Sequence, residues 1–124
     1  MQDEPTPSEL VKAVADFLRQ DIAPQVSAHS AFKLRVAINA LDLVTRQLAL
    51  QGDSDAAESA RLAQLLGIDG SLLDLNRALA ERIASGEADL NTPGLKEHLW
   101  QTTLAKLAVD QPNYAAYRRE RGEK

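Results

Sequence analysis

The sequence predicts an all-α protein, built as a compact bundle of about five helices, four main and one short, with antiparallel up-and-down connections. Hydrophobic residues make up 44% of the 124 residues, and aromatic residues only 4%. Alanine and leucine supply most of the apolar content and favour helices, whereas the β-branched and aromatic residues typical of strands are sparse. Apolar residues also recur every three or four positions, which is the period of an amphipathic helix.

The first predicted helix covers about residues 7–22. Thr6, Pro7 and Glu9 form a capping box, in which the threonine caps the helix and the proline takes its first position. Pro24 is expected to end the helix, because its ring clashes with the preceding turn. Apolar residues at a spacing of three or four predict one buried stripe. The stripe consists of Leu10, Val14, Phe17 and Leu18.

A long second helix is predicted from Ser30 to about Leu50, and it is the most apolar of the set. Such a helix is usually the central one of a bundle. Gly52 is expected to stop it, because glycine is common just past helix ends. A shorter helix should then open at Asp55 and close at Gly67.

Two further helices are predicted in the second half of the chain. Ser71 caps the first of them, which ends at Gly86. Thr92 and Pro93 open the second, as a Thr-Pro pair opens the first helix of the chain, and Pro112 ends it. Connections of about 2–8 residues favour antiparallel neighbours. The apolar stripe of the last helix is Leu95, Leu99, Thr103 and Leu107, flanked by Trp100 and Leu104.

A single helical domain is expected over residues 1–124, with a core of about 6–117 and mobile termini at 1–5 and 118–124. The N-terminus is acidic and carries two prolines, unlike the basic and then apolar layout of a signal peptide. No apolar run approaches the roughly 18–20 residues of a membrane span. We therefore expect a cytoplasmic protein that does not enter a membrane. The chain has no cysteine, which excludes disulfides and thiolate chemistry.

Charge and motifs exclude several classes of function. The net charge is −4, with acidic and basic residues interspersed, which argues against nucleic acid as a partner. His29 and His98 lie far apart and lack the Glu-x-x-His and His-x-x-x-His spacings of helical metal sites. None of the six glycines belongs to a phosphate-binding loop. We therefore predict no cofactor, no metal and no catalytic residue.

Polar stripes on the second and last predicted helices are the remaining candidates for a site, because each stripe keeps to one helical face. One interpretation is a groove that binds an anionic ligand through Arg35 and Lys106, or a partner protein. The other is that both stripes face water, with intrahelical pairs worth about 0.2–0.5 kcal/mol each. Asp110 has the wrong charge for a helix C-terminus, which suggests a specific partner such as Lys106. The candidate groove comprises Arg35, Asn39, Arg46, His98, Thr102, Lys106, Asp110 and Tyr114.

Four stretches of the chain resemble a small bacterial family of unknown function over roughly residues 5–117. The most specific of them contains TLAKLAVDQPNY, and the four are PTPSELVKAVADFLRQDIAP, AFKLRVAINALDLVTRQLAL, LNRALAERIASGEADL and LWQTTLAKLAVDQPNY. The resemblance implies a stand-alone helical protein, often encoded beside an aminoglycoside-phosphotransferase-like kinase and an acyl-CoA dehydrogenase. It carries over no catalytic residue.

Two functions from different classes remain open. The leading one is a non-catalytic accessory protein, a partner or regulator of a kinase-like phosphotransferase in an acyl-CoA-related pathway. The alternative is a small helical bundle that binds an acyl or phosphate-bearing molecule. An enzyme of unrecognised type is a third option, with His98 and Asp110 as its best candidates. The apolar second helix could also leave a face for a homodimer.

Overall fold

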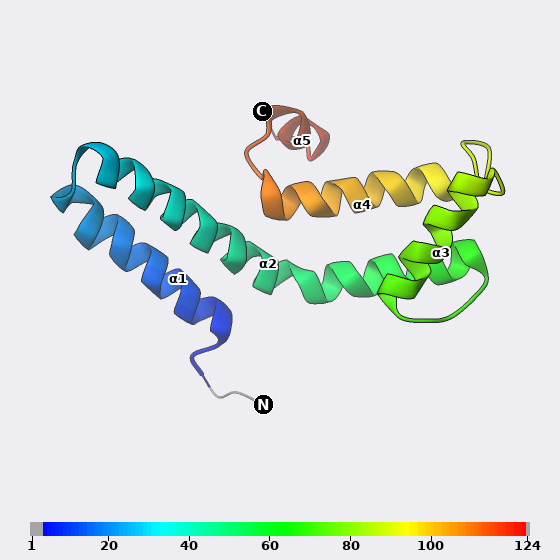
Figure 1. Ribbon diagram of the computed structural model, residues 1–124, viewed down its shortest axis with the longest axis horizontal. Helices are drawn as coiled ribbons and strands as arrows, with labels where there is room; N and C mark the ends of the chain where they lie inside the picture. The colour runs from blue at the N-terminus through cyan, green and yellow to red at the C-terminus, as the bar shows by residue number, and fades with distance from the viewer. Residues whose placement is uncertain (1–3, 124) are drawn as a thin grey trace. The chain divides into compact units, whose positions relative to one another are not determined.

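The computed structural model describes residues 4–123, and within them every regular element is helical (Figure 1). The prediction of an all-α protein is confirmed. The predicted mobile termini include residues 1–3 and 124, which lie outside the described residues. The five α-helices of the described range are α1 (Pro7–Phe17), α2 (Ala28–Leu66), α3 (Leu72–Ser85), α4 (Leu95–Asp110) and α5 (Ala115–Glu120).

The described residues fall into two compact units, which divide between Gln51 and Gly52. The first unit contains α1 and the part of α2 up to residue 51. The second contains the rest of α2 together with α3, α4 and α5. No helix within the described range is both long enough and apolar enough to cross a membrane.

The beginning of α1 follows the predicted capping pattern. The hydroxyl Oγ1 of Thr6 accepts a hydrogen bond from the backbone N–H of Glu9 at 3.2 Å, and Pro7 takes the first helical position. The helix continues as a π-helical turn at Leu18–Ile22 and a 3-10 turn at Ala23–Gln25. The α-helix thus ends at Phe17, before the predicted end near Ile22, and Pro24 lies inside the last turn of the helical run.

The predicted break at Gly52 is wrong. The segments expected to form two helices form one helix of 39 residues, α2. Glycine costs only about 1 kcal/mol relative to alanine inside a helix, which is too little to stop a helix that has strong helix formers before Gly52 and again from Ala56 onward. Asp55 therefore lies inside a helix and does not begin one.

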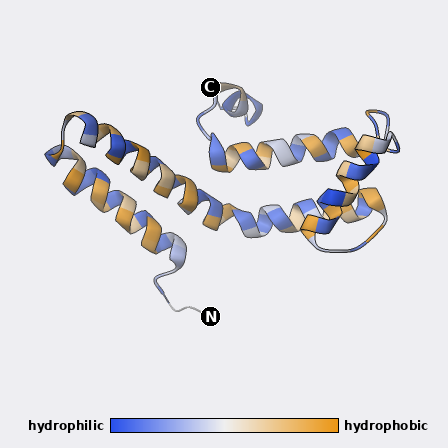
Figure 2. Ribbon diagram, viewed as in Figure 1, coloured by the Kyte–Doolittle hydropathy of each residue, from blue (hydrophilic) through white to orange (hydrophobic). Residues whose placement is uncertain are grey.

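The first unit is a helical hairpin in which α1 and residues 28–51 of α2 run antiparallel (Figure 1). Among its described residues only Ala15 and Ile38 are buried. The predicted buried stripe of α1 is wrong for three of its four members, since Leu10, Val14 and Phe17 are 45–51% exposed. The helix instead turns the neighbouring face inward, and that face carries Ser8, Val11, Ala15, Leu18 and Ile22. Figure 2 shows apolar residues along both helices of this hairpin.

The second unit contains a leucine-rich core. Its buried members come from α2, α3, the following loop and the first turn of α4, and Leu62 and Leu75 are the most enclosed. The predicted limits of α3 are confirmed: the hydroxyl of Ser71 accepts from the N–H of Asp74 at 3.1 Å, and Gly86 ends the helix with φ of 85°. The buried core cluster is Leu62, Leu66, Leu75, Leu79, Ala88 and Leu95.

The last long helix, α4, begins two residues later than the Thr-Pro pair predicts. The hydroxyl of Thr92 accepts a hydrogen bond from the N–H of Asp89 at 2.9 Å, so it stabilises the preceding turn and does not cap the helix. Gly94 takes the capping position with φ of 87°. The predicted apolar stripe of this helix is only partly buried: Leu95 is buried, whereas Leu99 is exposed.

The C-terminal stretch contains an element that the sequence did not predict. Pro112 ends α4 at Asp110, as expected. A six-residue helix, α5, then follows. Tyr117 on this helix is buried, and the guanidinium of Arg121 lies 5.5 Å from the centre of its ring. Tyr114, a member of the predicted groove, is 53% exposed.

Candidate functional site

A buried histidine and a partly buried arginine form the centre of the strongest candidate site, in the second unit. His98, on the second turn of α4, is only 3% exposed. The Nε–H of Arg61, on α2, donates to His98 Nδ1 at 3.3 Å. The Nη2 group of Arg61 donates to the hydroxyl of Thr102, one turn further along α4, at 3.3 Å. One guanidinium therefore bridges two positions of α4.

These contacts fix the state of the His98 ring. Because Nδ1 accepts a hydrogen bond, the ring is neutral and carries its proton on Nε2. Burial lowers the pKa of His98, and the positive charge of Arg61 lowers this pKa further, while Glu58 opposes the shift. If Nδ1 carried a proton, this N–H would point at the Nε–H of Arg61, and the two hydrogen-bond donors would repel each other. Geometry and electrostatics thus favour the same neutral form.

The Nε2 group of His98 is on the side of the ring that Arg61 does not contact. It makes no hydrogen bond with any other described residue, and no buried side-chain nitrogen or oxygen in the described range lacks a partner. Nε2 must therefore be accessible, and His98 lines a pocket of about 470 Å³. This volume lies within the roughly 300–1,000 Å³ range of small-molecule sites. The pocket is lined by Arg61, Gln64, Leu65, Pro93, Gly94, Glu97 and His98.

The structure brings together two of the eight residues of the predicted groove, His98 and Thr102, which both bind Arg61. Lys106 and Asp110 lie further along α4, where both are exposed, and no ion pair joins them among the described residues. Tyr114 follows α4 and is also exposed.

The other three residues of the predicted groove lie on the part of α2 that belongs to the first unit. The guanidinium of Arg35 lies 6.0 Å from the centre of the Phe32 ring, at the distance of a cation–π contact. Asn39 is exposed, and Arg46 is partly buried. Arg35 and Asn39 are therefore surface residues of the hairpin.

Sequence reasoning missed Arg61, which holds the site together. Its partner His98 is 37 positions away in the sequence, so no local spacing links the two. A signal was present, because Arg61 directly precedes the buried Leu62 on the apolar face of the helix. A positively charged side chain that is partly buried beside such a face needs a hydrogen-bond or ion-pair partner. The sequence gives no indication of which residue provides it.

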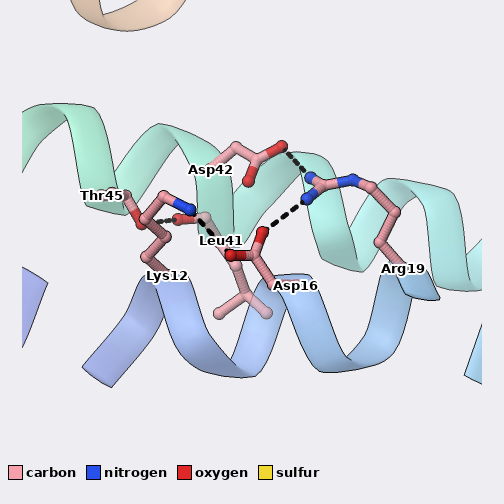
Figure 3. A network of polar contacts seen from close by, with 6 residues as sticks. All are labelled: Lys12, Asp16, Arg19, Leu41, Asp42 and Thr45. Atoms are coloured by element: carbon pink, nitrogen blue, oxygen red, sulfur yellow. Dashed lines mark hydrogen bonds and ion pairs between the residues drawn. The ribbon is translucent and has the colours of Figure 1, made fainter. Parts of the chain in front are cut away.

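A chain of ion pairs covers one side of the first-unit hairpin (Figure 3). Lys12 Nζ lies 2.7 Å from Asp16, and Arg19 bridges Asp16 at 3.0 Å to Asp42 of α2 at 2.6 Å. The hydrogen bond from Lys12 lowers the pKa of Asp16, and the charges of Lys12 and Arg19 act in the same direction. Arg19 lies in the π-helical turn that continues α1. Its ion pair places the side of this helix that carries Asp16 and Arg19 next to the side of α2 that carries Asp42.

The opposite side of the hairpin is apolar. With about 100° of rotation per residue, Leu10, Val14 and Phe17 turn away from the α1–α2 contact in the direction opposite to Lys12 and Asp16. On α2, Val44 and Leu48 likewise turn in the direction opposite to Asp42. All five therefore lie on the side of the hairpin away from the ion pairs. We call this surface the apolar patch: Leu10, Val14, Phe17, Val44 and Leu48, each 40–51% exposed.

The arrangement offers no metal centre within residues 4–123, where no three histidine or carboxylate side chains lie close enough together to hold an ion. What remains are a pocket lined by hydrogen-bond donors in one unit and an apolar surface in the other. Together with the fold, they define an all-helical protein with surfaces suited to binding. A family model described as a domain of unknown function, DUF6285, matches residues 24–114.

The chain belongs to the DUF6285 family, since the match covers well over half of its length. The matched range contains α2, α3 and α4 and hence the whole Arg61–His98 site, whereas α1 and α5 lie outside it. No curated protein and no solved structure matches the chain.

Proposed function

We propose that this chain is a cytoplasmic, non-catalytic accessory protein that binds another protein through the apolar patch. The observation that carries the proposal is that five large apolar side chains are exposed on one side of the hairpin. Among the described residues of this hairpin, only Ala15 and Ile38 are buried. Helices in proteins gain most of their stability from packing an apolar face against a neighbour. A partner would supply the neighbour that this side of the hairpin lacks within its own unit.

The size of the patch supports a protein as its occupant. Five large apolar side chains, each 40–51% exposed, lie on this one side of the hairpin. Exposed apolar patches of more than a few hundred Å² on a monomer often mark a binding surface. Each side of a standard interface contributes about 800 Å², a little over half of it apolar. The patch could therefore supply part of the apolar surface of such an interface.

The partner we propose is a kinase-like phosphotransferase, in a pathway that handles acyl-CoA. This part rests on the resemblance described above, whose members are often encoded beside an aminoglycoside-phosphotransferase-like kinase and an acyl-CoA dehydrogenase. A small helical protein that docks on the kinase could hold it in one conformation, because a ligand shifts an equilibrium by its difference in affinity for the two states.

Co-expression with the kinase encoded beside it tests the proposal. We expect the two proteins to purify together and the activity of the kinase to change when the accessory chain is present. Light scattering on the isolated chain provides the control for a homodimer. Separate purification with unchanged kinase activity would contradict the kinase as partner. If the isolated chain proves to be a dimer formed through the patch, a second copy occupies this surface instead.

A second candidate function, binding of a small molecule, is favoured by the pocket at His98 and Arg61. The predicted acyl or phosphate-bearing ligand would meet hydrogen-bond donors there. A ligand present at 100 times its dissociation constant should stabilise the protein by about 2.7 kcal/mol. A thermal-shift screen with CoA esters and sugar phosphates measures this, and the absence of any shift would count against both ligand classes.

A further inference from the structure

We propose that the pocket beside His98 binds a small monocarboxylate with an apolar tail, and that Arg61 and His98 hold its carboxylate group. The proposal rests on the second candidate function and names the chemical class of the ligand. It is independent of the apolar patch, which lies in the other unit.

Two residues that line this pocket, Arg61 and His98, each have a hydrogen-bond donor with no partner among the described residues. The neutral ring of His98 presents Nε2–H, and the residue that carries it is 97% enclosed by protein. The guanidinium of Arg61 uses Nε and one N–H of Nη2 on α4, which leaves its Nη1 group without a partner among the described residues. A planar guanidinium fits a carboxylate, which can accept two parallel hydrogen bonds from it.

The contacts of Arg61 also orient it in advance. Because His98 and Thr102 hold two of its N–H groups, the guanidinium loses little side-chain freedom when a ligand binds. The same contacts keep His98 neutral, so that Nε2 donates whether or not a ligand is present. The donors are thus in place before binding.

The remaining walls favour an apolar tail on the ligand. Leu65, Pro93 and Gly94 supply apolar surface next to the two donors. A volume of about 470 Å³ is within the range of small-molecule sites and is enough for a short acyl or aryl chain. At Gly94 a side chain would lie 3.7 Å from Leu65, so glycine leaves this part of the wall open.

Nearby carboxylates limit the charge of the ligand. Glu97 lines the pocket from α4, where it accepts a hydrogen bond from Gln101 at 2.8 Å. Glu58 on α2 acts on His98 electrostatically and accepts from Asn76 at 3.2 Å. Among the residues that line the pocket, the negative charge of Glu97 offsets the positive charge of Arg61, which disfavours a dianionic phosphate. A ligand with a single negative charge is repelled less by Glu97 than a dianion is.

Hexanoate, hexanamide and inorganic phosphate are the probes for an NMR titration of the full chain near neutral pH. We expect hexanoate to shift the backbone amide signals of Leu65, Gly94 and Glu97 and the ring signals of His98 in a saturable way. Hexanamide, which has the same shape without the charge, should bind at least about tenfold more weakly, since a hydrogen bond to a charged group is worth about 1.5–3 kcal/mol. Phosphate should leave these signals in place.

Variants provide the second readout. Arg61→Gln should weaken hexanoate binding at least about tenfold. Arg77→Gln removes an exposed arginine on α3, outside the pocket lining, and should leave binding unchanged. The comparison of hexanoate with hexanamide needs no variant, so it stands even if Arg61→Gln fails to fold.

The outcomes separate the ligand class from the candidate function. Equal binding of hexanamide and hexanoate would overturn the monocarboxylate and leave a ligand-binding pocket. Tighter binding of phosphate would also overturn it. If none of the three probes shifts the pocket signals, the monocarboxylate falls, while the thermal-shift screen with CoA esters and sugar phosphates still decides the small-molecule candidate and the protein-binding function is unaffected.

Discussion

At the scale of single residues, His98 shows how burial and one neighbour set a protonation state. Its ring is almost fully enclosed, and its Nδ1 accepts from Arg61. Both effects disfavour the charged form, so the pKa of His98 lies below its ordinary value. The stability of the protein must therefore depend on pH through this residue.

The sign of that dependence follows from linkage. In the unfolded chain the histidine titrates near its ordinary pKa of about 6.5. In the folded protein the pKa of His98 is lower, so between the two values the unfolded chain binds more protons. The stabilising contribution of neutral His98 is complete above about pH 6.5 and is lost as the pH falls toward its folded pKa.

The free energy of unfolding of the parent protein should fall as the pH decreases below about 6.5. We expect a smaller fall for His98→Gln, because glutamine binds no proton in this range. Urea unfolding at a series of pH values measures the slope. His29→Gln is the matched control, because His29 is exposed on α2, and it should keep the slope of the parent protein. Equal slopes for the parent and His98→Gln would contradict the buried, neutral histidine.

At this scale the sequence named two of the three residues that the structure joins at Arg61. His98 and Thr102 were recognised because they share a face of one helix, which is a local property. Arg61 was missed because its contacts cross from α2 to α4. Helical spacing shows which residues share a face, but the packing of helices decides which faces meet.

At the scale of helices, two glycines show the limit of local signals. The sequence marks Gly52 as the end of a helix, and a second glycine, Gly94, directly follows the Thr92-Pro93 pair that was predicted to open the last helix. In the structure Gly52 continues α2, whereas Gly94 has φ of 87° and caps α4. Glycine permits both conformations, so the residue type does not choose between them.

Alanine substitutions distinguish the two glycines. Gly52→Ala should raise the free energy of unfolding by about 0.5–1 kcal/mol, because alanine favours the helix and no atom lies within 4 Å of the added Cβ. Gly94→Ala should lower it by about 1–2 kcal/mol, the cost of a left-handed conformation. Urea unfolding measures both changes. Destabilisation by Gly52→Ala would indicate that α2 breaks at this position.

The pairing of α1 with α2 can be tested through its ion pair. A double-mutant cycle with Arg19→Ala and Asp42→Ala should give a coupling of about 0.2–1 kcal/mol that weakens in high salt, because both side chains are partly exposed. A cycle of Arg19 with Glu9, an exposed residue ten positions earlier in the same helical run, is the control and should give none. Absence of coupling at low salt would contradict this pairing.

At the scale of the whole molecule, composition and periodicity were enough to predict an all-α protein. They did not predict which apolar stripe each helix buries. On α1 the two stripes are similar in pattern, and the one with the larger side chains, Leu10, Val14 and Phe17, is the exposed one. A helix buries the face that allows close packing, and at Ala15 a small residue provides it. The large side chains that remain exposed carry the proposed function.

The most direct test of that function compares two valines of similar exposure on the same hairpin. Val14 belongs to the apolar patch and is 50% exposed, while Val36 lies on α2 outside the patch and is 54% exposed. Binding of the kinase-like partner is measured for Val14→Glu and Val36→Glu, with circular dichroism to verify that both fold. We expect Val14→Glu to weaken binding at least about 30-fold, since an unpaired charge buried in an interface costs about 2 kcal/mol or more. We expect Val36→Glu to bind like the parent chain. Equal affinity of the two variants would contradict the apolar patch as the binding surface.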